Sequence, residues 1–157
     1  MNKYVLSLLV EDQAGVLNKI AGLFTRRGYN IDSLTVGITD DPGLSRMTIT
    51  FTGDCSMLEQ INKQLNKLIN VIKVQELSGD SVCRELALVK VNYSIKNQSM
   101  IKEAVNIFRG NVVDIDSKSM MVELTGTEDK ITAFIELVKP YGIKEVVRSG
   151  LTGLERG

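Results

Sequence analysis

Hydrophobic residues recur with two different periods along this chain, and these periods predict its elements. A mostly apolar run at 4–10 is too short for an independent helix and predicts a buried strand, while apolar residues at helical spacing follow within 14–27. Alternating apolar residues at 34–38 and 47–51 flank the turn sequence Asp-Asp-Pro-Gly. This arrangement predicts a β-hairpin.

A second helical stripe and a short strand complete the first half of the pattern. Leu58, Ile61 and Leu65 share one helical face, and the spacing of Ser56 and Glu59 predicts a capping box at the start of that helix. Apolar residues resume immediately afterwards and predict a strand. The order of the first half is therefore βαββαβ.

The second half repeats this order after a polar stretch at 78–82 that has no apolar period. Its predicted elements are a strand at 86–91, a helix at 101–108, strands at 112–115 and 120–124, a helix at 131–138 and a strand at 143–147. The repeat is also visible in the letters, since LFTRRG in the first half corresponds to IFRG in the second. We therefore expect one small fold in two copies.

The predicted fold class is α+β, with two tandem ferredoxin-like βαββαβ domains at 1–77 and 83–157, joined by a linker at 78–82. Each domain has two helices on one face of a four-stranded sheet, which leaves the other face uncovered. Domains this small bury little surface alone, so we expect pairing with another copy.

Composition and charge exclude several classes of function. The chain has 19 basic and 19 acidic residues, so it lacks the basic stripe that nucleic acids require. No apolar stretch approaches the roughly 20 residues of a membrane span, and no secretory signal is visible, so we expect a cytoplasmic protein. Cys55 and Cys83 lack the spacing of a zinc site, and the absence of histidine rules out a Ser-His-Asp or Cys-His mechanism.

The junction of the first strand and the first helix is a candidate ligand site. Asp12 is placed to cap the helix, and the free backbone N–H groups of a helix start attract an anion. Gly15 permits a close approach to the backbone, and the carboxylate of Asp12 suits an ammonium group, so a zwitterionic amino acid fits both. Alternatively, Asp12 is only a cap and Gly15 only part of a loose first turn.

Longer segments resemble a known family. The segments LLVEDQAGVL, FTRRGYNIDSLTVG and TDDPGLSRMTI are similar to the N-terminal ACT domain of acetolactate synthase (acetohydroxyacid synthase) small regulatory subunits. RELALVKV, IFRGNVVDI and RSGLTGLERG resemble the C-terminal domain of the same family. The resemblance therefore covers nearly the whole chain.

The resemblance implies an ACT domain that senses an effector and dimerises edge to edge. A branched-chain amino acid, usually valine, would bind the loop and helix start of one subunit and the second strand of its partner. Carried onto this sequence, the effector site comprises Asp12, Gly15, Val16, Leu17, Asn30 and Ile31. Many family members have asparagine where this chain has Asp12. Asn30 would bind the polar head of the ligand, although asparagine is also common in turns after a glycine.

The resemblance also implies a partner and a role. The chain would be a non-catalytic regulatory subunit that activates a large catalytic subunit and confers feedback inhibition by valine. Thiamine diphosphate, Mg²⁺ and FAD would belong to that partner, and this chain would bind no cofactor. A freestanding ACT-type sensor acting on another partner, a small ferredoxin-like enzyme and a transcription regulator are the alternatives, but no carboxylate pair, reactive lysine motif or DNA-binding module is visible.

Overall fold

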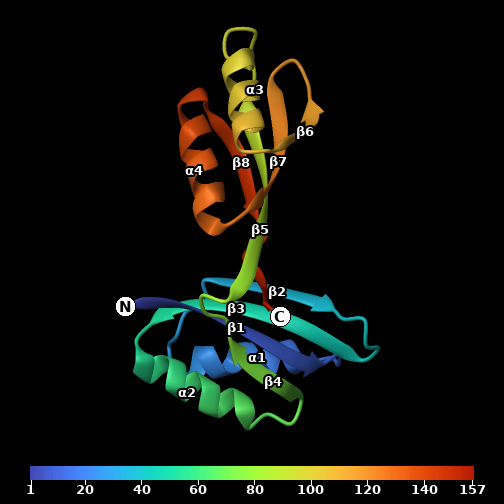
Figure 1. Cartoon of the computed structure of the whole chain (residues 1–157), viewed down its shortest axis with the longest axis vertical. Coiled ribbons are helices and arrows are strands. Elements are labelled where there is room, and N and C mark those ends of the chain that lie inside the picture. The colour runs from blue at the N-terminus through green and yellow to red at the C-terminus, as the bar shows by residue number, and fades with distance from the viewer. The chain divides into compact units, whose positions relative to one another are not determined.

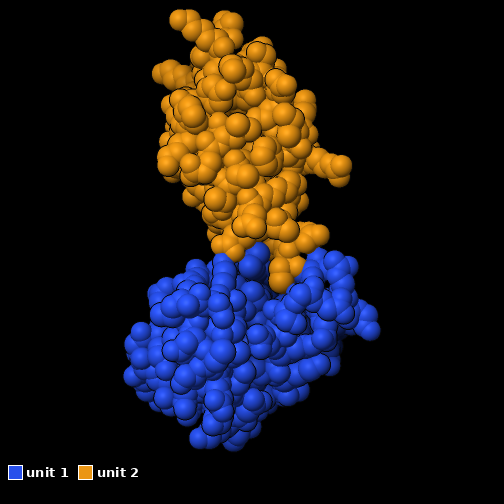
Figure 2. Space-filling view, turned by 60° about the vertical axis from the view of Figure 1, so that its left-hand side comes forward, with its two compact units in different colours: residues 1–82, 151–157 blue, residues 83–150 orange.

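The computed structural model describes all 157 residues and divides the chain into two compact units. Unit 1 comprises residues 1–82 and 151–157, and unit 2 comprises residues 83–150 (Figure 2). The chain therefore leaves unit 1 after Val82 and returns to it after Gly150. This division differs from the predicted domains in two segments, because the predicted linker at 78–82 and the last seven residues both belong to unit 1.

Unit 1 is an antiparallel four-stranded sheet with two helices on one face (Figure 1). Its elements are β1 (Asn2–Glu11), α1 (Val16–Arg26), β2 (Ser33–Ile38), β3 (Leu44–Gly53), α2 (Cys55–Asn66) and β4 (Val71–Glu76). The returning chain adds β9 (Thr152–Glu155), which pairs with the strand β5 (Ser81–Asn92) and not with this sheet. The strand order is β2-β3-β1-β4, so β2 and β4 are the edge strands of this sheet.

Unit 2 has the same arrangement (Figure 1). Its elements are β5 (Ser81–Asn92, which begins in unit 1), α3 (Gln98–Ile107), β6 (Asn111–Ile115), β7 (Ser119–Gly126), α4 (Glu128–Val138), the short 3₁₀ helix η1 (Lys139–Tyr141) and β8 (Ile143–Arg148). The strand order is β6-β7-β5-β8. The prediction of two tandem ferredoxin-like βαββαβ folds is confirmed.

Each unit has its own hydrophobic core between the helices and the sheet. In unit 1, Ile20 and Phe24 of α1 pack against Ile49 and Phe51 of β3, and all four side chains are at most 1% exposed. The rings of Phe24 and Phe51 meet edge to face at 5.7 Å between centroids. Burial of such side chains contributes roughly 1.5–3 kcal/mol each. The helical period of the sequence therefore matches the buried face of α1.

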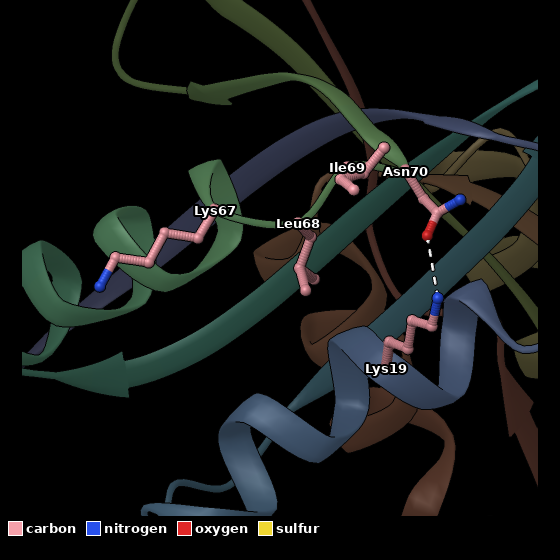
Figure 3. A pocket seen from close by; sticks show the side chains of 5 residues that line it. All are labelled: Lys19, Lys67, Leu68, Ile69 and Asn70. Carbon is pink, nitrogen blue, oxygen red and sulfur yellow. Dashed lines mark hydrogen bonds between the residues drawn. The ribbon is translucent and has the colours of Figure 1, made fainter.

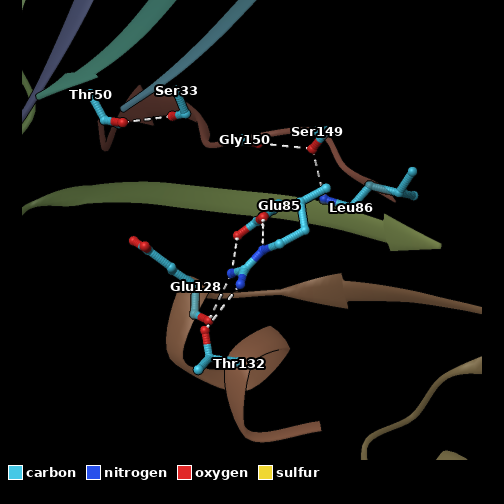
Figure 4. A network of polar contacts seen from close by, with 9 residues as sticks. Ser33, Thr50, Glu85, Leu86, Glu128, Thr132, Ser149 and Gly150 are labelled. Atoms are coloured by element: carbon cyan, nitrogen blue, oxygen red, sulfur yellow. Dashed lines mark hydrogen bonds and ion pairs between the residues drawn. The ribbon is translucent and has the colours of Figure 1, made fainter. Parts of the chain in front are cut away.

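Unit 2 contains an ion pair between a buried carboxylate and an arginine at the surface. Glu85 is 4% exposed and accepts two hydrogen bonds from the guanidinium of Arg148, at 2.6 and 3.0 Å (Figure 4). This hydrogen bonding raises the pKa of Arg148 above its usual value, and Arg148 also donates to the hydroxyl of Thr132 at 3.2 Å. Both carboxylate oxygens of Glu85 are thus satisfied, as a buried charge requires.

The predicted helix caps are wrong at both helices of unit 1. α1 starts at Val16 after Gly15, which has a left-handed backbone, and no side chain caps it, so Asp12 is not the cap. α2 is capped by Asp54, whose side chain accepts a hydrogen bond from the N–H of Met57 at 2.8 Å, rather than by Ser56. The spacing of apolar residues shows which face of a helix is buried, but it does not show at which residue the helix begins. The caps were therefore assigned to the wrong residues.

The last residues of the chain cover part of the open face of the unit 1 sheet. The hydroxyl of Thr35 donates to the carbonyl of Leu151 at 3.0 Å, and the N–H of Gly153 donates to the hydroxyl of Thr48 at 3.3 Å. Met47 belongs to the core, and side chains alternate along a strand, so Thr48 points away from the helices. Thr48 is nevertheless only 2% exposed. The expectation of an uncovered second face is therefore wrong for the part of the unit 1 sheet around Thr35 and Thr48.

Candidate functional site

The loop between β1 and α1 exposes a backbone turn that a ligand can reach. The N–H of Asp12 donates to the carbonyl of Gly43 at 2.7 Å, which fastens the start of the loop to the hairpin between β2 and β3. Residues 12–15 are exposed, and Gly15 has a φ of 87°. A Cβ atom at Gly15 would meet nothing within 4 Å. The space above the start of α1 is therefore open.

Several backbone N–H groups at this helix start have no acceptor within the chain. They belong to Ala14, Gly15, Leu17 and Asn18. Such groups carry the positive end of the helix dipole and bind water or an anion. Val16 is buried at 4% exposure, whereas Leu17 is 44% exposed. Two of the predicted residues, Gly15 and Leu17, thus have N–H groups without an acceptor, and Leu17 also has an accessible apolar side chain.

A polar bridge through the residue that precedes β4 supports this loop. The ammonium of Lys19 donates to the amide oxygen of Asn70 at 3.1 Å (Figure 3), and the amide nitrogen of Asn70 donates to the carboxylate of Glu11 at 3.4 Å. The N–H of Glu11 also donates to the carbonyl of Asn70 at 2.9 Å. The sequence analysis missed Lys19 and Asn70, because residues 51 apart leave no local signal of their contact.

The second predicted part of the site lies between α1 and β2. The amide of Asn30 donates to Asp32 at 3.1 Å, and Asp32 in turn accepts from the hydroxyl of Thr52 at 2.8 Å. This arrangement holds the Asn30 side chain through its nitrogen and leaves its oxygen as a free acceptor. Ile31 is partly buried against the core. Asp32 was not predicted as a site residue. Its position two residues after Asn30 was the signal in the sequence that could have indicated this hydrogen bond.

A single chain does not bring the two parts of the site together. The strand register places Glu11, before the first loop, opposite Leu44, and Ser33, after Asn30, opposite Thr50. Six residues of β3 separate these positions, which corresponds to about 20 Å. One free amino acid is much shorter than that. A site that uses both parts therefore requires a second copy of the chain.

Neither the cysteines nor any acidic cluster forms a metal site. The structure contains no group of three or more His, Cys, Asp or Glu residues that could hold a metal ion. No helix is long and apolar enough to cross a membrane.

Comparison with family models covers both halves of the chain. Residues 6–73 match the model described as an AHAS small subunit-like ACT domain, and residues 84–157 match the model of the small subunit of acetolactate synthase. The first match includes all predicted site residues. The second includes the segment 151–157 that packs with unit 1.

Full-length relatives agree with these matches. A probable acetolactate synthase small subunit of Archaeoglobus fulgidus is 50% identical over 155 residues, which are 99% of this chain and 98% of that protein. The acetolactate synthase small subunit of Mycolicibacterium smegmatis is 51% identical and covers 98% of this chain and 91% of its own length. The crystal structure of an acetolactate synthase small subunit from Thermotoga maritima is 39% identical, covers 100% of this chain and 99% of that chain, and has a TM-score of 0.92.

Proposed function

The chain belongs to the family of acetolactate synthase small subunits, and from this membership we propose that it activates the catalytic large subunit and makes it sensitive to valine. This role belongs to the biosynthesis of valine, leucine and isoleucine. The chain has no histidine, and we propose that it takes no part in the chemical step. Thiamine diphosphate, Mg²⁺ and FAD would bind to the large subunit. A cytoplasmic location remains a prediction.

We propose that the effector binds between two copies of unit 1 that pair through their β2 edges. β2 is an edge strand, and its residues Val36 and Ile38 are 48% and 82% exposed. Antiparallel pairing of two β2 strands lays the start of one strand beside the end of the other. The Asn30 end of one copy then approaches the hairpin that holds Asp12 of the other. This pairing would bring together the two parts of the site, which lie about 20 Å apart within a single chain.

The unpaired N–H groups at the start of α1 carry this proposal. In the proposed pose they bind the carboxylate of the amino acid, since Leu17 and Asn18 have no acceptor within the chain. The free oxygen of Asn30 from the other copy accepts a hydrogen bond from the ammonium group of the amino acid. The carboxylate of Asp12 lies at the ammonium end of the ligand as well. Ile31 and Leu17 then contact the branched side chain. Recognition of both charges selects an amino acid over a simple acid or amine.

Effector binding would act on the large subunit by shifting the small-subunit dimer between two geometries. An effector changes activity only to the extent that it binds one geometry more tightly than the other. A coupling of about 1–3 kcal/mol corresponds to a 5- to 150-fold change. A few contacts across the β2 edges suffice for such a coupling.

Activity measurements with the cognate large subunit test the proposed function. We expect acetolactate formation to rise when the chain is added and to fall again when L-valine is added to the mixture. The large subunit alone should respond much less to L-valine. Equal activity with and without the chain would contradict the activating role, whereas activation that valine does not reverse would contradict only the effector role.

A further inference from the structure

The outer face of the helix layer in unit 1 contains a groove between α1 and α2. Three adjoining hollows of about 400, 440 and 450 Å³ follow it and share lining residues. Their lining includes Lys19, Arg26, Lys67, Leu68 and Ile69. Figure 3 shows the hollow at the Asn70 end, with Leu68 between the side chains of Lys19 and Lys67. The face is thus hollowed along its length.

The charge of this groove has a single sign. Lys19, Arg26, Arg27 and Lys67 line it, none of them forms an ion pair, and no acidic residue lines any of the three hollows. The only acidic residue within α1 and α2 is Glu59, which pairs with Lys63 at 3.4 Å. The chain as a whole has no net charge, so the groove is a local concentration of positive charge.

The groove also presents apolar surface. Ile69 is 90% exposed, and Leu68 beside it is partly exposed. A nucleic acid or a free phosphate gains no binding energy from an exposed isoleucine beside the basic residues of its site. A protein surface with acidic residues around an apolar contact matches both properties, because interfaces combine a buried apolar centre with a charged rim.

Two other surfaces of unit 1 already have an occupant or a proposed one. The C-terminal residues of the chain cover part of the open face of the sheet, and the β2 edge pairs with a second copy in the proposed dimer. The helix layer has neither, and its groove combines positive charge with exposed apolar side chains. We propose that the groove between α1 and α2 is a docking surface for the catalytic large subunit, which contributes an acidic segment with an apolar side chain. This inference rests on the proposed partnership with that subunit.

Binding of the purified chain to its cognate large subunit tests this inference. The double variant Arg26→Glu/Lys67→Glu should raise the Kd at least about tenfold at an ionic strength of about 0.05 M, mainly through slower association. The matched control Lys73→Glu/Lys96→Glu changes the net charge equally at exposed positions outside the groove and should shift the Kd less than about twofold. The neutral variant Arg26→Gln/Lys67→Gln should fall between the two and avoids a carboxylate at a helix C-terminus.

Changes of ionic strength and an apolar substitution separate the electrostatic from the apolar contribution to binding of the large subunit. Raising the ionic strength to about 0.5 M should weaken binding of the unaltered chain and reduce its difference from the charge-reversed variant. Ile69→Ser should weaken binding by about tenfold at both ionic strengths, because it removes an apolar contact. If the groove variants bind like the matched control while the unaltered chain binds tightly, the docking surface is wrong and the proposed function stands. If the unaltered chain does not bind the large subunit, both are wrong.

Discussion

Among single residues, Gly15 has the most direct role in the candidate site, because its left-handed backbone forms the turn that leads into α1. Its φ of 87° is costly for residues with a side chain, yet a Cβ atom there has open space. We predict that Gly15→Asp reduces the affinity for L-valine at least about tenfold, since its carboxylate would lie where the ligand carboxylate binds. Calorimetric titration measures the loss, and sedimentation should show that the dimer persists because Gly15 is not in β2.

A nearly isosteric substitution serves as the control for this prediction. Gly15→Asn imposes a similar backbone strain, and both residues tolerate the left-handed region better than most. If repulsion between carboxylates is the cause, the Asn variant retains clearly more affinity than the Asp variant. Equal losses in both variants would show that the side chain acts by its size alone, and unchanged binding in both would remove Gly15 from the site.

Asp116 makes the turn between β6 and β7 dependent on pH. Its carboxylate accepts hydrogen bonds from the backbone N–H groups of Lys118 and Ser119 at 2.6 and 2.7 Å, which hold the pKa of this carboxyl below its usual value. The stabilisation is therefore present above the ordinary aspartate pKa of about 3.9 and is lost as the pH falls through the lower folded-state value.

Substitution by asparagine tests this dependence, because it keeps the acceptor oxygen and removes the charge. We predict that the difference in unfolding free energy between the unaltered chain and Asp116→Asn shrinks between about pH 6 and about pH 3. Urea denaturation at both pH values measures it. Asp40→Asn, at an exposed aspartate in the hairpin between β2 and β3, is the control. A difference that does not change with pH would contradict the assignment.

At the scale of elements, β2 has a free edge that the proposed dimer uses. The N–H of Thr39 donates to the carbonyl of Leu44 at 3.0 Å, and bonded positions alternate in an antiparallel ladder. Val36 therefore directs its N–H away from β3, toward the open edge. We predict that Val36→Pro converts the dimer to a monomer while unit 1 stays folded, because proline is tolerated at edge positions that do not bond within the sheet.

Sedimentation and circular dichroism measure these two effects, and Val36→Thr, which keeps the N–H, should remain dimeric. A dimeric Val36→Pro variant with intact effector binding would contradict pairing through β2. Pairing of this kind was expected from the resemblance to ACT domains. The hydrophobic period predicted β2 itself, but the direction of its N–H groups follows only from the observed register.

The spacing of apolar residues predicts some features of this fold and not others. The helices and strands follow from alternating or helical apolar positions, and Ile20 and Phe24 are buried as their spacing predicts. The cap at Gly15 was not predicted, because it depends on a backbone angle rather than on hydrophobicity. The bridge between Lys19 and Asn70 depends on a contact between elements. Local patterns thus predicted the elements, whereas the support of the candidate site is tertiary.

At the scale of the whole molecule, the end of the chain stabilises the unit in which the chain begins. Leu151 is 7% exposed within unit 1, although sequence and family model both group it with the C-terminal half. We predict that Leu151→Ala lowers the unfolding free energy by about 2–3 kcal/mol. Leu154→Ala, at a residue that is 59% exposed, should change it by less than about 0.5 kcal/mol. Urea denaturation measures both, and equal effects would contradict burial of the tail.

Isothermal titration of the chain with L-valine measures the proposed effector site itself. We predict stereospecific binding in the micromolar to millimolar range at concentrations where the dimer persists, with no binding of D-valine. L-leucine and L-isoleucine in parallel titrations rank the branched side chains. Heat of binding that disappears in the monomeric Val36→Pro variant would agree with a site built from two copies. Absence of binding by all three L-amino acids at a dimeric concentration would contradict the effector site and leave only the partnership with the large subunit.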